Sequence, residues 1–215
     1  EAERQGYLLR LRVELHRRGF TASAAIQSQH MDVTELFAAS PLEYLRREQF
    51  AAYKQECGHR VGFEMLDGPF CVRAVRLPGL AGTLSWPTQP DLNFAHELAG
   101  RVKVIACLDQ QPILLHSEKW PDYAGATQEL RRVKDKVGCA ADDAVVVVWG
   151  VERDTLCAAE EVRLRYADAT VGVPAETRQP FADGSTFFER ILPGPDRMYP
   201  DTDSPPQRIV RERVT

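Results

Sequence analysis

Leucines recur at helical spacing near the start of the chain. Leu8, Leu11 and Leu15 lie three or four residues apart with arginines between them, which is the pattern of an amphipathic helix. We expect this helix to span residues 2–18 and to end at Gly19, because glycine readily adopts the left-handed backbone that closes a helix.

A second helix is predicted after Ser40. Ser40 has the side chain of an N-cap, Pro41 suits the first helical position, and Glu43 would complete a capping box. Apolar residues then follow at helical spacing, and Gly58 is expected to end the helix.

The clearest strand signal is a hairpin. Segments 61–66 and 70–77 flank Asp67 and Gly68, a dipeptide that accepts the positive φ of a tight turn. Residues 70–77 also alternate in character, so their side chains should point to two different faces.

Helices and strands alternate further along the chain. The expected elements are a helix from Asp91 to Ala106, a strand over 112–116, a helix over 126–137, a strand over 145–149 and a helix from Asp154 to about residue 169. The run 145–149 is apolar throughout, as in a strand at the centre of a sheet. From residue 173 onward, frequent prolines favour extended or irregular chain. This order predicts an α+β fold: a two-layer sandwich with a mainly antiparallel sheet and helices on one face, plus a flanking helix and an extended tail.

Composition excludes several classes of protein. Of the 215 residues 44% are hydrophobic and 27% charged, and the formal net charge is -4, so any RNA contact must come from a local basic patch. No stretch approaches the roughly 20 apolar residues that cross a bilayer. The five cysteines include no C-x-x-C pair, which favours buried thiols in a reducing cytoplasm over a zinc site or a disulfide framework. The sequence contains no phosphate-binding loop, dinucleotide-binding loop, HExxH or GxSxG motif, so no self-contained nucleotide or hydrolytic site is visible.

A histidine and a carboxylate stand at the end of one predicted strand. His116 and Glu118 are two residues apart and therefore point to the same face. They would either contact a partner or RNA, or hydrogen-bond to the loop that follows.

Basic residues crowd one predicted helix. Arg131, Arg132, Lys134 and Lys136 would either meet RNA phosphates or form a solvated helix face, which is the usual role of a charge run.

Two carboxylates lie in the proline-rich tail. Asp201 and Asp203 occupy a turn beside Met198 and Tyr199 and could help to hold Mg²⁺, which takes few carboxylates together with phosphates and waters. The same residue types also simply favour turns.

Several segments, taken in order, resemble a known family. The most specific is the tail Arg197-Met198-Tyr199-Pro200-Asp201-Thr202-Asp203-Ser204-Pro205-Pro206, which follows Pro174-Ala175-Glu176-Thr177-Arg178 and Ala182-Asp183-Gly184-Ser185-Thr186. Segments 32–37, 75–82 and 116–118 and the helix 4–18 also match. Over nearly the whole chain the sequence resembles the E-subunit family of archaeal-type Glu-tRNA(Gln) amidotransferases, in the region of an inserted GAD domain that bacterial aspartyl-tRNA synthetases share.

The resemblance implies an architecture and an activity. Residues 1–20 would lead in from the parent scaffold, 21–193 would form the GAD insert with a DCoH-like fold, and 194–215 would return to the catalytic cradle domain. The parent enzyme converts Glu-tRNA(Gln) to Gln-tRNA(Gln). Its E subunit uses ATP and Mg²⁺ to activate the γ-carboxyl as an acyl phosphate, and an asparaginase-like D subunit supplies ammonia. By the same resemblance Asp201, where the family more often has Glu, would lie beside the kinase centre as a metal or phosphate-site residue, with Asp203 close by.

The chain has no initiator methionine, and we expect it to be a piece of a longer protein that is inactive alone. One alternative is a freestanding GAD-type module that binds tRNA or a protein. Another is an aspartyl-tRNA synthetase insert, which would not supply the turn 198–206. In a fragment the first helix and the tail should pack poorly, whereas in a freestanding module they should bury their apolar residues.

Overall fold

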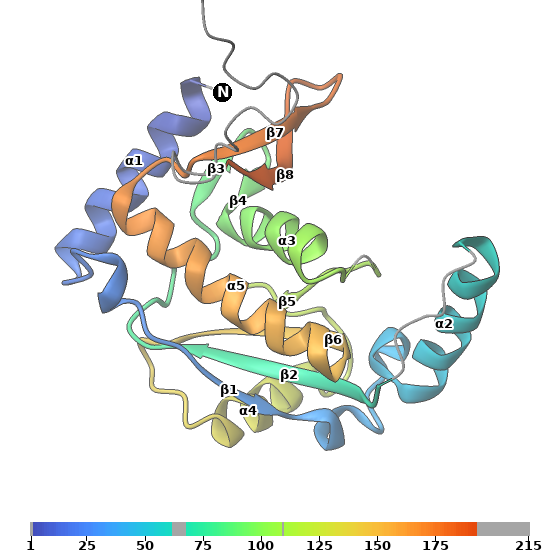
Figure 1. The fold of residues 1–215 in the computed structure, drawn as a ribbon. Helices are drawn as coiled ribbons and strands as arrows, with labels where there is room; N and C mark the ends of the chain where they lie inside the picture. Colours follow the sequence, from blue (N-terminus) through green and yellow to red (C-terminus); the bar gives the residue numbers. More distant parts are fainter. Residues whose placement is uncertain (1, 62–67, 109, 193–215) are drawn as a thin grey trace, which may run out of the picture.

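A four-stranded antiparallel sheet lies at the centre of the computed structural model, which describes residues 2–61, 68–108 and 110–192 (Figure 1). Its strand order is β1-β2-β6-β5. The strands are β1 (Gln29–Asp32), β2 (Phe70–Leu77), β5 (Leu115–His116) and β6 (Ala144–Val151). β2 and β6 pair along their whole length, from Phe70 opposite Val151 to Leu77 opposite Ala144.

The sheet separates two hydrophobic clusters because successive strand side chains point to opposite faces. On one face Val75 and Val146 pack with the first cluster, and on the other Val72 and Val147 pack with the second. Every residue of β6 is buried, which confirms that the apolar run 145–149 is a central strand.

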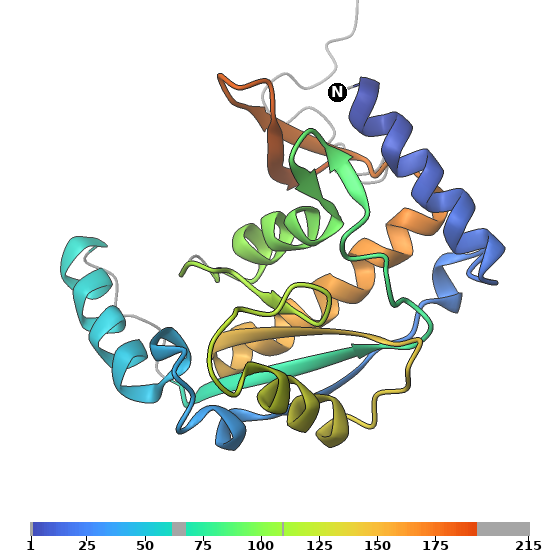
Figure 2. The same cartoon turned by 180° about the vertical axis from the view of Figure 1, so that it is seen from behind.

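The long helices cover one face of the sheet. α5 (Glu152–Val171) lies against β2 and β6, and α3 (Phe94–Ile105) and α1 (Ala2–Arg17) pack around α5 (Figure 1). The other face carries α4 (Ala126–Lys136) and the 3-10 turns η2 (Thr34–Phe37) and η3 (Glu43–Leu45), as Figure 2 shows from behind. α2 (Arg47–Val61) follows η3, and a further 3-10 turn, η1 (Ser23–Ala25), follows α1.

Two small hairpins stand apart from the central sheet. They consist of β3 (Pro87–Gln89) with β4 (Leu92–Asn93) and of β7 (Glu176–Pro180) with β8 (Thr186–Ile191). β8 packs on α3, where the buried Phe188 contributes its side chain. The prolines after residue 173 therefore do not prevent a regular hairpin from forming.

The predicted α+β class, with a mainly antiparallel sheet and a helical layer, is confirmed. The opposite face, which we expected to lack helices, is covered in part by α4. Val133 of α4 and Val137, which caps its C-terminal end, pack against that face, so the helix buries its apolar side there while its charged side faces solvent.

The hairpin predicted around Asp67 and Gly68 is not formed by the described residues, in which β2 pairs with β1 and β6. Val61 is the last residue of α2, and residues 62–67 lie outside the described part of the chain.

Several predicted helix ends also differ from the structure. Gly58 lies inside α2, and Ser40 accepts a hydrogen bond from Leu42 N–H ahead of η3 instead of capping α2 directly. Asn93 caps α3, because Asp91 lies in the β3–β4 turn with φ 59°. α5 begins at Glu152, two residues before the expected cap at Asp154.

The first helix is part of the main core. Leu8, Leu11 and Leu15 are fully buried in the same cluster as α3 and α5. The poor packing that we expected of this helix in a fragment is therefore wrong: its apolar stripe meets a complementary surface on α5.

The cysteines only partly match expectation. Cys71 is buried, but Cys107 and Cys157 are exposed. Within the described ranges, no helix has the length and apolarity that crossing a bilayer requires.

Candidate functional site

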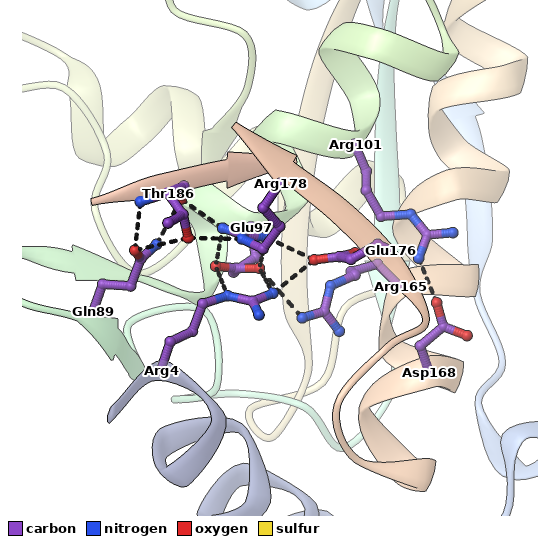
Figure 3. Close-up of polar contacts among 9 residues, drawn as sticks. All are labelled: Arg4, Gln89, Glu97, Arg101, Arg165, Asp168, Glu176, Arg178 and Thr186. Atoms are coloured by element: carbon purple, nitrogen blue, oxygen red, sulfur yellow. Dashed lines mark hydrogen bonds and ion pairs between the residues drawn. The ribbon is translucent and has the colours of Figure 1, made fainter. Parts of the chain in front are cut away.

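Charged residues interrupt the apolar stripes of three helices at the point where these helices meet. Arg4 precedes Leu8 by one turn on α1, Glu97 lies beside Leu98 on α3, and Arg165 precedes Tyr166 on α5. A residue on such a stripe faces the core whatever its charge. The fold therefore brings buried charges together between α1, α3 and α5 (Figure 3).

Glu97 is the centre of this charge cluster. Arg4 donates to its carboxylate through Nε at 3.1 Å and Nη2 at 2.8 Å. Arg178 donates to both Glu97 oxygens, at 3.0 Å and 3.1 Å, and Arg165 Nη2 lies 3.5 Å from Oε2. The Glu97 side chain is 2% exposed, so these contacts replace the water that an ionised carboxylate needs.

The C-terminal hairpin joins the cluster through β7. Glu176 accepts hydrogen bonds from Arg4 Nη2 at 2.7 Å and from Arg178 Nη1 at 2.6 Å. Arg178 also donates to the Oγ1 and the carbonyl oxygen of Thr186, which ties β7 to β8. Gln89 Nε2 donates to the same carbonyl at 2.9 Å, so the β3–β4 hairpin is attached as well.

A second group of charges extends the cluster along α5. Arg101 pairs with Glu161 at 3.1 Å and with Asp168. Among the described residues, the two groups together contain four arginines and four carboxylates: Arg4, Arg101, Arg165 and Arg178 with Glu97, Glu161, Asp168 and Glu176.

The electrostatics keep Glu97 ionised. Burial alone would raise the pKa of its carboxyl, but the hydrogen bonds from Arg4 and the charges of Arg165, Arg4 and Arg178 outweigh burial and bring this pKa to about 2. Burial lowers the pKa of Arg165, whose guanidinium stacks 4.8 Å above the ring of Phe94.

Some polar atoms of the cluster have no hydrogen-bond partner among the described residues. These buried atoms are Arg165 Nε and Nη1 and Glu176 Oε2. The ion pairs of the cluster suit the positioning of the helices and hairpins that they join. They do not suit proton transfer, because the Glu97 carboxylate, with a pKa of about 2, is a poor base near neutral pH. In the described part of the chain, no group of three or more His, Cys, Asp or Glu side chains is arranged to hold a metal ion.

The predicted basic helix presents its charges to solvent. Arg131, Arg132 and Lys136 are exposed and Lys134 is half-buried on α4. Arg131 forms only a loose pair with Asp135 at 3.8 Å, whereas Lys136 donates to Glu35 at 2.8 Å. Arg131 and Arg132 therefore remain accessible to an anionic partner.

The predicted pair at the end of β5 is turned inward. His116 is buried, and burial lowers the pKa of its imidazole. The Glu118 carboxylate accepts backbone N–H groups of Gly82 at 2.8 Å, Leu84 at 3.2 Å and Ser85 at 2.8 Å. Glu118 therefore holds the loop after β2, whereas the alternative stated from the sequence named the loop that follows β5.

Curated proteins with similar sequences cover the whole chain. No family model matches the sequence. The chain is 36% identical over 214 residues to the glutamyl-tRNA(Gln) amidotransferase E subunit of Methanopyrus kandleri and 34% identical over 214 residues to that of Methanocaldococcus jannaschii. It is 33% identical over 212 residues to that of Pyrococcus furiosus. These matches include 99–100% of this chain but only 30% of each relative.

The chain is homologous to part of the amidotransferase E subunit. The resemblance of the sequence to the E-subunit family is thereby confirmed. The chain spans about 30% of the length of the E-subunit relatives that it matches.

The tail motif that carried the resemblance most specifically lies outside the described residues. This applies to Arg197, Met198, Tyr199 and Pro200 and to the candidate metal or catalytic residues Asp201 and Asp203. Their proposed roles in the amidotransferase stay predictions.

Sequence reasoning missed the charge cluster. Arg4 and Glu97 are 93 residues apart, so no local motif joins them. A signal was nevertheless available, because Arg4, Glu97 and Arg165 each fall on the apolar stripe of their own helix. A charge in that position predicts a buried ion pair, although not the identity of its partner.

Proposed function

We propose that this chain is a non-catalytic segment of a tRNA-dependent amidotransferase subunit, which converts Glu-tRNA(Gln) to Gln-tRNA(Gln). The observation that carries the proposal is homology to the E subunit along the whole chain, although the chain matches only 30% of that protein. Within the longer subunit it would act as a GAD-type insert that contributes structure and contacts tRNA.

The contact between α1 and the β7–β8 hairpin supports an inserted segment. The start of α1 and this hairpin lie at the same end of the molecule (Figures 1 and 2). Arg4 and Glu176 are 172 residues apart, yet their side chains meet at 2.7 Å. A domain whose entering and leaving segments are adjacent is readily accommodated within another chain.

Catalysis would depend on parts of the subunit outside this chain. ATP and Mg²⁺ would serve the longer subunit in the cytoplasm, and an asparaginase-like D subunit would supply ammonia. The described residues offer no group of three or more His, Cys, Asp or Glu side chains for a divalent metal, and the buried Glu97 carboxylate is already occupied by arginines.

An amidation assay tests this assignment. The 215-residue chain is combined with a D subunit, ATP, Mg²⁺, an ammonia donor and Glu-tRNA(Gln), and the full-length Methanopyrus kandleri E subunit serves as the positive control. We expect Gln-tRNA(Gln) in the control alone. Formation of Gln-tRNA(Gln) by the chain itself would contradict a non-catalytic role.

One observation favours a second candidate, a freestanding module that binds tRNA or a protein. α1 buries Leu8, Leu11 and Leu15 in the main core, as we expected of a freestanding module. This candidate predicts that the chain folds and binds tRNA without the rest of the amidotransferase.

A further inference from the structure

Apolar side chains remain exposed where α1 and α5 meet. Leu9 is 46% and Val13 67% exposed on the outer side of α1. Val171 and Val173, at the end of α5 and just beyond it, are 66% and 38% exposed. We refer to Leu9, Val13, Val171 and Val173 as the outer patch.

These four residues form one continuous surface. Gly172 lies between the two valines, and a Cβ atom on Gly172 would be 3.5 Å from Leu9 Cδ2. His16 Nε2 lies 2.8 Å from the carbonyl oxygen of Thr170, which keeps the end of α5 against α1. Leu9 and Val13 are one helical turn apart and therefore adjacent.

α1 is consequently apolar on two sides. Its inner side buries Leu8, Leu11 and Leu15 completely, while its outer side presents Leu9 and Val13. A helix with one apolar stripe lies on the surface of a protein, whereas a helix with apolar residues on both sides is typical of a position between two packed bodies.

The border of the outer patch indicates the chemistry of what covers it. Arg10 and Arg12 are exposed beside it, and Arg12 Cδ would lie 3.7 Å from a Cβ on Gly172. A complementary surface would have an apolar centre with carboxylates at its rim, because charged rims of opposite sign favour docking in one orientation.

We propose that the outer patch is the docking surface for the remainder of the same subunit. This inference rests on the proposed function. Relatives have 70% of their length outside the matched segment, since the match covers 30% of each. The start of α1 and the β7–β8 hairpin lie at the same end of the molecule. Leu9 is only about 10 Å from the start of α1 at the helical rise of about 1.5 Å per residue.

Cysteine labelling tests the docking surface. Val13→Cys is introduced in this chain, and a cysteine is placed at the aligned position of the full-length Methanopyrus kandleri protein. Val104→Cys, at an exposed position on α3, provides the matched control in both proteins. Labelling by a maleimide is measured by peptide mass spectrometry, and each rate is divided by the rate for the same cysteine in the denatured protein.

We expect the cysteine at position 13 to react freely in this chain and several-fold more slowly in the full-length protein. Equal normalised rates in the two proteins would overturn the docking surface. They would leave the proposed function intact, because the homology does not depend on the labelling result, and that function is tested separately by amidation.

Charge insertion provides an independent measurement. Val13→Glu should leave the thermal midpoint of this chain unchanged, because the side chain is exposed, but glutamate at the aligned position should lower the midpoint of the full-length protein. Sedimentation of this chain should show a monomer. A dimer that Val13→Glu dissociates would place a second copy on the outer patch and overturn the proposal.

Discussion

Glu97 joins the parts of the molecule through one carboxylate. Arg4 from α1, Arg165 from α5 and Arg178 from β7 all reach it, although they are far apart in the sequence. A buried ion pair adds little stability relative to an apolar pair of the same shape, but removal of one partner leaves the other charge buried and uncompensated. The arginines therefore make the identity of residue 97 critical.

Glu97→Gln should destabilise the chain strongly. We expect a loss of roughly 3–5 kcal/mol in the free energy of unfolding, because the surrounding arginines lose their counter-charge while remaining buried. Urea denaturation measures the change. Glu160→Gln is the matched control, since Glu160 pairs with Arg163 on the surface of α5 and such pairs contribute about 0.2–1 kcal/mol. Equal losses in the two variants would contradict a central role for Glu97.

The same carboxylate should make stability depend on pH. The pKa of Glu97 is about 2 in the folded chain, against about 4.3 in an unfolded chain. Since the folded value is the lower one, its contribution is fully present above about pH 4.3 and is lost as the pH falls toward 2. The stability difference between the wild-type chain and Glu97→Gln should therefore shrink by about 3 kcal/mol between pH 5 and pH 2. Urea titrations of both proteins across this range would reveal a constant difference if the prediction is wrong.

At the scale of elements, the charge cluster attaches the C-terminal hairpin to the helical layer. Arg178 contacts Glu97, Glu176 and Thr186 at the same time, through all three guanidinium nitrogens. Lysine cannot reproduce this geometry, because its ammonium is a single point of charge. The hairpin should thus open locally when the guanidinium is lost.

Arg178→Lys should accelerate amide hydrogen exchange in β7 and β8 while exchange in β6 stays unchanged. β6 is buried between β2 and β5 and does not depend on the cluster. Arg190→Lys, at an exposed position of β8, should leave the hairpin as protected as in the wild-type chain. Exchange that rises equally in β6 would indicate global unfolding and contradict a local attachment.

Sequence patterns correctly predicted a strand that is apolar on both faces and a helix that has one apolar stripe. Residues 145–149 are apolar on both faces and form the central strand, and the stripe of α1 is buried as expected. Both results follow from periodicity, which is a local property. The resemblance to the E-subunit family could likewise be recognised from the sequence, since it depends on motifs that occur in a fixed order along the chain.

The sequence did not reveal which distant segments pair with each other. The Asp67-Gly68 dipeptide predicted that β2 pairs with the segment just before it, but the described partners of β2 are β1 and β6, which are remote in sequence. The turn-forming tendency of a dipeptide does not indicate which remote strands pair with β2. The partners of Glu97 were hidden for the same reason, because a charge on an apolar stripe predicts an ion pair without specifying the second residue.

At the scale of the whole molecule, the sheet separates two different surfaces. α4 presents Arg131 and Arg132 on one side, and the outer patch on α1 and α5 lies on the other (Figures 1 and 2). The proposed function, in which tRNA contacts α4 and the remainder of a longer subunit contacts the outer patch, therefore requires no competition between these two partners.

Replacement of the α4 arginines tests the tRNA side of that arrangement. The formal net charge of -4 opposes non-specific RNA binding, so affinity for tRNA(Gln) should depend on the local basic face. We expect Arg131→Glu with Arg132→Glu to weaken binding several-fold at low salt. The slope of log affinity against log salt should also fall by about 1 for each phosphate that the variant no longer neutralises. Fluorescence anisotropy with labelled tRNA(Gln) at low and moderate salt measures both quantities.

Arg153→Glu is the matched control for this test. Arg153 is equally basic and well exposed, but it lies at the start of α5, on the opposite face of the sheet from α4. Its replacement changes the net charge by the same amount per residue without altering the α4 face. Equal weakening by the α4 and α5 variants would indicate a general charge effect, and binding that ignores salt would exclude phosphate contacts altogether. Greater weakening by the α4 variant per replaced charge would assign the tRNA-contacting face to α4, because the comparison per charge leaves only the position of the replaced arginines different.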